Sequence, residues 1–131
     1  MYSALYTTQK QLDLTLYQFS YSGLKDALIE LRTRGVRVRL ILEPRVDSNL
    51  ETASFLSKRG VDVRWASLEY TNTHSKLALI DERCVLVGSI NWSRSAVQTN
   101  REAAVFFCDA ATARVFQKTF EQDWLDATPV K

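Results

Sequence analysis

Two neighbouring segments decide the fold of this chain: His74-Ser75-Lys76-Leu77-Ala78-Leu79-Ile80-Asp81 and Gly88-Ser89-Ile90-Asn91. The apolar runs 76–80 and 84–87 predict two strands, and the polar residues 81–83 between them predict a tight hairpin. Side chains two residues apart on a strand point to the same side, so His74 should project together with Lys76, and Ser89 with Asn91. Four polar groups are therefore expected to converge at one end of a sheet.

Upstream of this hairpin, the chain contains two similar units of strand, helix and strand. Apolar residues predict the strands at 12–19, 36–42 and 61–65. Ser22 is the expected N-cap of the first helix, and Ser48 with Glu51 has the spacing of a capping box for the second. Gly35 and Gly60 mark the helix ends. The short turns between such units imply right-handed crossovers and parallel pairing.

Downstream of the hairpin, a further strand is expected at 100–107, followed by a closing helix. Asp109 should cap that helix, whose apolar positions share one face: Ala113, Phe116, Phe120 and Trp124. The sequence therefore predicts one α/β domain over residues 1–131, with a mixed and largely parallel central sheet and helices on both faces.

The composition is that of an ordinary globular domain. The chain has 131 residues, 46% of them hydrophobic, and a formal net charge of +2, which excludes a disordered chain and tolerates a phosphate-rich partner. No integral membrane segment is expected, because no apolar run approaches roughly 20 residues. The N-terminus does not resemble a secretion signal, and the choice between cytoplasm and periplasm or secretion stays open. Cys84 and Cys108 lack metal-ligand spacing, so buried free thiols are predicted ahead of a disulfide.

The residue types in the two quoted segments suit attack on a phosphodiester. His74 is the only histidine, and a neutral imidazole can attack phosphorus to form a covalent phosphohistidine. Lys76 and Asn91 can hold the non-bridging oxygens as charge develops on them, and Ser89 can donate one more hydrogen bond. Spacing alone is a weak signal, because a lone histidine beside a strand is more often structural than catalytic.

In one-letter form the pattern reads H-x-K-x4-D-x6-G-S-x-N, followed by N-x-E at 100–102. It resembles the signature of the phospholipase D-like phosphodiesterase superfamily, and looser similarity covers nearly the whole chain. The resemblance implies the phospholipase D-like fold and phosphodiesterase activity. Members usually begin with an additional strand and helix, which are not found before residue 11. The chain is therefore expected to be either a natural single-motif protein or one half of a two-motif protein.

The resemblance implies a catalytic set of six residues: His74, Lys76, Asn91, Glu102, Ser89 and Asp81. Family members use two such histidines per site, so a homodimer that completes the active site at its interface is expected. The second histidine would protonate the leaving alkoxide, and the two would titrate as a coupled pair. Glu102 is the candidate for orienting each imidazole. For Asp81 the alternative is a turn residue that hydrogen-bonds the backbone.

No metal and no cofactor are expected. Lysine, asparagine, serine and an imidazolium already supply the donors for a phosphoryl group, and no carboxylate cluster or second His or Cys ligand has metal spacing. Substrate contacts are expected from residues that flank the motif: Arg94, Arg101, Tyr70, Trp92 and Arg45. The arginines suit phosphates, and the aromatic rings could stack on a base or line a lipid pocket.

Three functions fit these residues. A low-specificity endonuclease on DNA or RNA is favoured by the single motif, the small size and the modest basic surplus. A phospholipase D-type hydrolase or transphosphatidylase on phospholipids would use the same intermediate, although no amphipathic segment for bilayer contact is evident. A catalytically silent, dimerising nucleic-acid-binding module is the third, and the intact set of His74, Lys76 and Asn91 argues against it.

Overall fold

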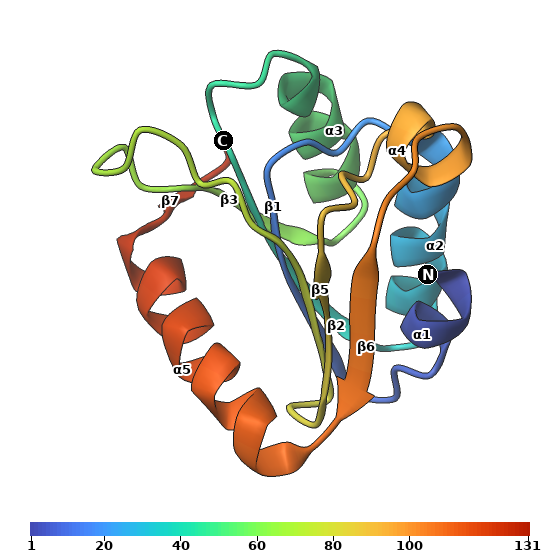
Figure 1. Cartoon of the computed structure of the whole chain (residues 1–131). Helices are drawn as coiled ribbons and strands as arrows, with labels where there is room; N and C mark the ends of the chain where they lie inside the picture. The colour runs from blue at the N-terminus through green and yellow to red at the C-terminus, as the bar shows by residue number, and fades with distance from the viewer.

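The computed structural model describes all 131 residues and contains one seven-stranded sheet with helices on both faces (Figure 1). The elements follow the chain as α1 (Tyr2–Tyr6), β1 (Gln11–Leu16), α2 (Ser22–Thr33), β2 (Arg37–Leu42), α3 (Ser48–Ser57), β3 (Asp62–Trp65), β4 (Lys76–Ile80), β5 (Cys84–Gly88), α4 (Arg94–Gln98), β6 (Ala104–Cys108), α5 (Ala110–Asp126) and β7 (Thr128–Pro129). The strand order β6-β5-β4-β1-β2-β3-β7 places the motif hairpin β4–β5 directly beside β1.

The strand pairing corrects the expectation of a largely parallel sheet. Only β1, β2 and β3 run parallel to one another. The other four pairings are antiparallel: β1–β4, β4–β5, β5–β6 and β3–β7. The two strand–helix–strand units were predicted correctly, and so were the mixed sheet and the hairpin. The antiparallel half is larger because the hairpin after Ile80 reverses the chain and β6 continues the alternation.

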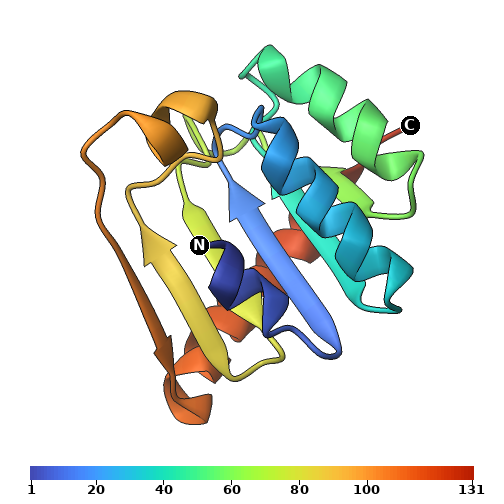
Figure 2. The ribbon, with the colours of Figure 1, turned by 90° about the vertical axis from the view of Figure 1, so that its right-hand side faces the viewer.

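The sheet separates two hydrophobic layers of unequal size. Leu12, Leu14 and Leu16 of β1 point into the larger layer, under α1, α2 and α3, and Figure 2 looks onto these three helices. The smaller layer lies on the opposite face, where α5 buries Ala113, Phe120 and Trp124 against Ile41, Leu79 and Val85. In Figure 2 α5 lies behind the sheet. One helix covers this second face, so it leaves room for a cavity near the motif.

A buried ionic network fixes α5 to the sheet. Arg39 of β2 donates to Asp13 of β1 at 2.7 and 2.9 Å and to Glu121 of α5 at 3.0 and 2.5 Å. Gln117 of α5 also donates to Asp13, at 2.8 Å. Asp13 is fully buried, and a buried carboxylate that lost its partner would be strongly destabilising. The network therefore determines where α5 crosses the strands.

The helix ends agree in part with the predicted signals. Gly35 and Gly60 have φ angles of +90° and +88° and follow α2 and α3, as expected. Asp109 caps α5 through its side chain, also as expected. The capping roles of Ser22 and Ser48 were wrong, because both are the first helical residue and no side chain caps either helix. None of the helices combines the length and the apolar character that crossing a membrane requires.

Cys84 and Cys108 form a disulfide, so the prediction of buried free thiols was wrong. The two residues lie directly opposite each other in the β5–β6 pairing, and Cys108 is exposed on the edge strand. The bond ties β6 to β5 at the end of the strands remote from Gly88. It therefore anchors the strand that follows Glu102.

Candidate active site

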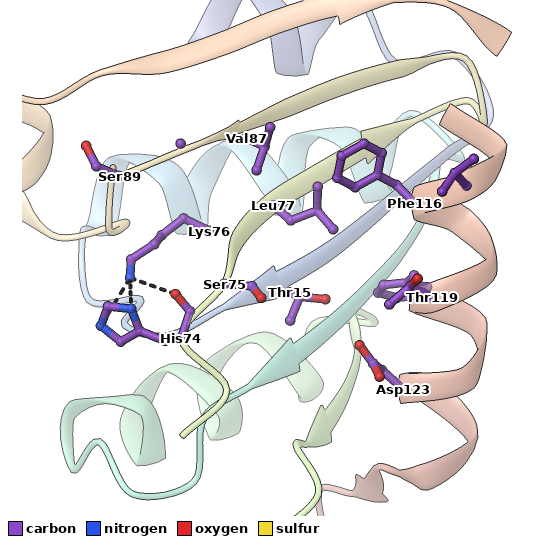
Figure 3. A pocket seen from close by; sticks show the side chains of 13 residues that line it. Thr15, His74, Ser75, Lys76, Leu77, Val87, Ser89, Phe116, Thr119 and Asp123 are labelled. Atoms are coloured by element: carbon purple, nitrogen blue, oxygen red, sulfur yellow. Dashed lines mark hydrogen bonds between the residues drawn. The ribbon is translucent and has the colours of Figure 1, made fainter. Parts of the chain in front are cut away.

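His74 and Lys76 contact each other at the start of β4. Nζ of Lys76 lies 2.8 Å from Nδ1 and 3.3 Å from Nε2 of His74, and it donates to the His74 carbonyl oxygen at 2.7 Å (Figure 3). The ammonium group of Lys76 therefore lies directly beside the imidazole, where it can bind the oxygens of an anionic phosphoryl group that approaches His74.

Tyr17 lies against this pair. Its ring centroid is 4.4 Å from that of His74, and Nζ of Lys76 lies 5.2 Å from the same tyrosine ring. Tyr17 directly follows β1, and its backbone N–H donates to the Ser75 carbonyl oxygen at 2.9 Å. The β1–β4 pairing thus continues almost to His74. The aromatic ring limits where the imidazole can rotate and attracts the ammonium by a cation–π contact.

Ser89 and Glu102 form the other side of the site. Oγ of Ser89 donates to the Glu102 carboxylate at 2.6 Å, and Nδ2 of Asn100 donates to its second oxygen at 3.1 Å. The two segments approach closely at Gly88, where an added Cβ would lie 2.3 Å from the Ala103 carbonyl oxygen. Only glycine allows this approach. The glycine of the Gly-Ser pair therefore places Ser89 within reach of Glu102.

The charges of Lys76 and Glu102 influence each other. Partial burial lowers the pKa of Lys76, and the negative charge of Glu102 counteracts part of that effect. The hydrogen bonds from Ser89 and then Asn100 lower the pKa of Glu102, and the charge of Lys76 lowers it further. Glu102 is thus held as an anion that helps to keep Lys76 protonated.

A buried carboxylate fixes the loop that precedes His74. Glu43, which is completely buried, accepts a hydrogen bond from the backbone N–H of Thr73 at 2.6 Å and from Nη1 of Arg45 at 2.9 Å. Asn49 donates to the carbonyl oxygens of Tyr17 and Glu43 at 2.8 and 2.9 Å. These bonds connect the ends of β1 and β2 to the loop. The position of His74 therefore depends on side chains that do not touch it.

A cavity of about 660 Å³ opens beside His74, on the face of the sheet that α5 covers (Figure 3). Thr15, Leu77 and Val87 form its sheet side as neighbours in adjacent strands. Its helix side consists of Val115, Phe116, Thr119, Phe120 and Asp123. A second hollow of about 290 Å³ shares His74, Ser75, Thr119 and Asp123 with it. His74 therefore lies where the two hollows meet.

The family model described as "Cardiolipin synthase, PLD-like domain" matches residues 1–124. The chain belongs to the phospholipase D-like family. Its similar relatives include the mitochondrial cardiolipin hydrolase of Mus musculus, which is 35% identical over 130 residues, or 98% of this chain. The corresponding protein of Xenopus tropicalis is 37% identical over 131 residues, or 95% of this chain. The chain spans 58% and 60% of the length of these two relatives.

The phospholipase D-like fold also appears in solved structures. Nuc from Salmonella typhimurium, a phospholipase D family member, superposes with a TM-score of 0.92 at 22% identity, with 99% of this chain and 88% of that chain covered. At this level of identity the match concerns the fold. The predicted phospholipase D-like fold is thus confirmed.

The structure brings together four of the six predicted catalytic residues of the family motif. His74, Lys76 and Ser89 line the same cavity, and Glu102 reaches it through Ser89. No hydrogen bond joins Glu102 to His74 within the chain, so the expected orientation of the imidazole by its own Glu102 is not found. Oδ1 of Asn91 is buried without a hydrogen-bond partner, and Asn91 does not line the cavity.

Asp81 lies at the far end of β4 from His74, away from the other predicted catalytic residues. Its carboxylate accepts hydrogen bonds from the backbone N–H groups of Gln9, Lys10 and Gln11 at 2.9, 2.8 and 2.9 Å. Asp81 also has a φ of +53° in the hairpin turn. It is the turn residue of the alternative interpretation, and it holds the chain at the entrance to β1.

Only one of the predicted substrate contacts lies beside His74. Tyr70 lines the second hollow together with His74 and is 60% exposed. Arg94 and Arg101 are exposed outside the cavity, and Arg45 is held by Glu43. Trp92 was wrongly predicted as a contact, because it is buried with its ring edge against Phe19. Its backbone bonds to the segment after β1, which directs its side chain into the core.

Sequence reasoning missed Tyr17 and Glu43. Each is the first residue after a parallel strand, since β1 ends at Leu16 and β2 at Leu42. The carboxyl ends of parallel strands are where α/β sheets gather their functional residues. That position was the available signal for both residues.

Proposed function

We propose that this domain cleaves phosphodiesters through a covalent phosphohistidine on His74. The contact of Lys76 with the His74 ring carries the proposal. A ring nitrogen attacks phosphorus, and the bond from phosphorus to the leaving alcohol breaks as that alcohol takes up a proton. Water then attacks the phosphohistidine, which releases the imidazole and a phosphomonoester. Lys76 stabilises the charge on the non-bridging oxygens, and Ser89 joins it by turning its hydroxyl proton from Glu102 to the phosphoryl group.

The proton for the leaving group comes, in this proposal, from His74 of a second copy of the chain. The uncovered part of the sheet beside α5 supports such a homodimer. Leu77, Val87 and Val105 are neighbours across β4, β5 and β6 on that face, and Val105 is 56% exposed. Val115 of α5 is 68% exposed beside the same cavity. A second copy covering this surface would bury apolar area next to His74.

We infer a phospholipid as the first candidate substrate. The wall of the cavity beside His74 includes Leu77, Val87, Phe116 and Phe120, which suits the acyl-bearing part of a lipid phosphodiester. The cardiolipin hydrolases to which the chain is similar support the same class. DNA or RNA is the second candidate. The exposed Arg94 and Arg101, which flank the motif, support a nucleic acid, because a guanidinium group can donate two parallel hydrogen bonds to one phosphate.

Metal independence is part of the proposal. Lys76 is the proposed donor to the phosphoryl oxygens, and no group of three or more His, Cys, Asp or Glu side chains is placed to hold a metal ion. We therefore expect the activity to persist in excess EDTA.

One experiment tests the chemistry and ranks the substrates. Wild type and His74→Asn are incubated in EDTA with cardiolipin vesicles and, separately, with supercoiled plasmid and single-stranded RNA. The proposal requires cleavage by wild type alone and an acid-quenched phosphoprotein that is absent from His74→Asn. Equal cleavage by both proteins would exclude His74 as the nucleophile. The mass in solution, measured by light scattering, must be that of a dimer when activity is present.

A further inference from the structure

Four polar side chains point into the cavity beside His74 without any partner in the chain. Thr15, Ser75, Thr119 and Asp123 all line the cavity, and none of their side chains makes a hydrogen bond within the protein. Thr15 is only 3% exposed, Asp123 is half-buried, and Ser75 and Thr119 are exposed. Figure 3 shows Thr119 and Asp123 projecting from α5 toward Thr15 and Ser75. These four side chains are therefore available to a ligand in the cavity.

Asp123 is half-buried and differs from the two fully buried carboxylates of the protein. Asp13 is held by Arg39 and Glu43 by Arg45. Asp123 has no such cation, and partial burial raises its pKa, with a further contribution from the charge of Asp126. The chain therefore places a carboxylate and three hydroxyl groups without protein partners around one cavity, next to the proposed nucleophile.

We propose that Asp123, Thr119, Thr15 and Ser75 form a subsite for a hydrogen-bond donor, a hydroxyl or a primary ammonium, on an alcohol esterified to the phosphoryl group. The inference rests on the proposed function. Asp123 accepts a charge-assisted hydrogen bond, and the hydroxyl groups can accept or donate the rest. Asp123 is then a specificity-determining residue that touches substrate and takes no part in the bond changes.

The charge distribution gives this subsite a direction. Lys76 and Asp123 lie on opposite sides of the cavity (Figure 3), and Asp126 lines the second hollow together with Asp123. A phosphoryl group at His74 and Lys76 thus places its substituent between apolar Leu77 and acidic Asp123. A second phosphate directly at Asp123 would be repelled, so the further phosphates of cardiolipin or of a nucleic acid would have to lie outside this subsite. The subsite therefore selects a neutral or cationic alcohol there.

The test uses four p-nitrophenyl phosphodiesters, whose second alcohol is ethanol, glycerol, 2-aminoethanol or choline. Each loses p-nitrophenolate, so the second alcohol stays on the phosphoryl group that is transferred to His74. We expect kcat/KM of wild type for the glycerol or aminoethyl ester to exceed that for the ethyl ester about 10- to 100-fold. The comparison of the glycerol ester with the aminoethyl ester identifies whether the preferred donor is a hydroxyl or an ammonium group. Choline carries charge without an N–H donor, so a preference for it equal to that for aminoethanol would overturn the proposal.

The variants Asp123→Ala and Thr119→Val test the assignment. The ratio of kcat/KM for the donor-bearing ester to kcat/KM for the ethyl ester should fall to about 1 in Asp123→Ala and should also decrease in Thr119→Val. Asp62→Asn, a change at an exposed aspartate of β3, is the matched control and should retain both the activity and the preference. A full preference in a folded Asp123→Ala protein would overturn the subsite.

A binding measurement separates this inference from the proposed function. Calorimetry compares ethyl phosphate, glycerol 3-phosphate and phosphoethanolamine on wild type and Asp123→Ala. If no ester is hydrolysed, the proposed function fails, while tighter binding of a donor-bearing phosphate that depends on Asp123 still supports the subsite. Equal binding of all three phosphates would overturn it.

Discussion

The ammonium of Lys76 lies 2.8 Å from Nδ1 of His74 and 5.2 Å from the ring centroid of Tyr17. The geometry ties the nucleophile and its charge stabiliser into one unit, so neither should function without the other. We expect His74→Asn to lower kcat about 10³-fold or more. Lys76→Met should lower it about 10²-fold or more through loss of charge stabilisation. The kcat of both variants is measured in EDTA on the substrate that the wild-type protein cleaves, and far-UV circular dichroism checks that both variants are folded. Near-wild-type activity in Lys76→Met would exclude its proposed role.

Glu102 should control the alkaline limit of activity through Lys76. Lys76 must be protonated to bind phosphoryl oxygens, and burial lowers its pKa while Glu102 counteracts that effect. Glu102→Gln removes the counteracting charge, so the pKa of Lys76 should fall and the alkaline limb of the pH–rate profile should move to lower pH. The control is Glu82→Gln in the hairpin turn, where Glu82 contacts Gln11 away from the site. An alkaline limb that stays in place in Glu102→Gln would separate Glu102 from Lys76.

The sequence could predict the motif half of this site because its geometry is local. His74 and Lys76 are two residues apart on one strand, and a tight hairpin then returns the chain toward Gly88. The spacing of apolar residues also identified β1 and β2 as strands and α2 and α5 as helices. Asp81 shows the limit of a motif: its spacing is fixed by the turn, and only the structure shows its carboxylate on three backbone N–H groups.

The parts that sequence reasoning missed depend on contacts between distant segments. Glu43 and Thr73 are 30 residues apart, and no period of the sequence relates them. Asp123 reaches the site because Arg39 and Glu121 fix α5 on the sheet. The short α4 and β7 have too few residues for a periodic signal. Trp92 follows the motif in sequence, but its backbone bonds turn the side chain into the core.

The Cys84–Cys108 disulfide should stabilise the edge of the sheet. It joins residues 24 apart, and closing a loop of this length restricts the unfolded chain by about 3 kcal/mol. Cys84→Ser with Cys108→Ser should lower the free energy of unfolding by up to that amount in urea, and reducing agent should do the same to wild type. Insensitivity of the wild-type midpoint to reductant would show that the bond contributes nothing.

Asp81 should contribute to stability and not to catalysis. Partial burial would raise the pKa of Asp81, but the N–H groups of Gln11, Gln9 and Lys10 lower it below its ordinary value. Its contribution is therefore present above the ordinary pKa and is lost as pH falls through the folded value. Asp81→Asn tolerates the positive φ but weakens three hydrogen bonds, so we expect about 2 kcal/mol of destabilisation at pH 7 and little difference in strong acid. The rate on saturating substrate below the melting temperature should be unchanged, and a large loss of kcat would return Asp81 to the catalytic set.

Asp123 should have the opposite effect on stability. Partial burial and the charge of Asp126 raise its pKa above 3.8 in the folded chain. The stability associated with its protonated form is fully present below the unfolded pKa and is lost as pH rises through the folded pKa. Asp123→Asn keeps the shape without the charge, so its melting temperature should exceed that of wild type at pH 7, and the gain should vanish near pH 3. Thermal unfolding of both proteins across this pH range measures the difference. A gain in stability combined with a loss of the substrate preference would mean that the carboxylate is retained for binding at the expense of the fold. An unchanged melting temperature at pH 7 would show that the chain or solvent already satisfies Asp123.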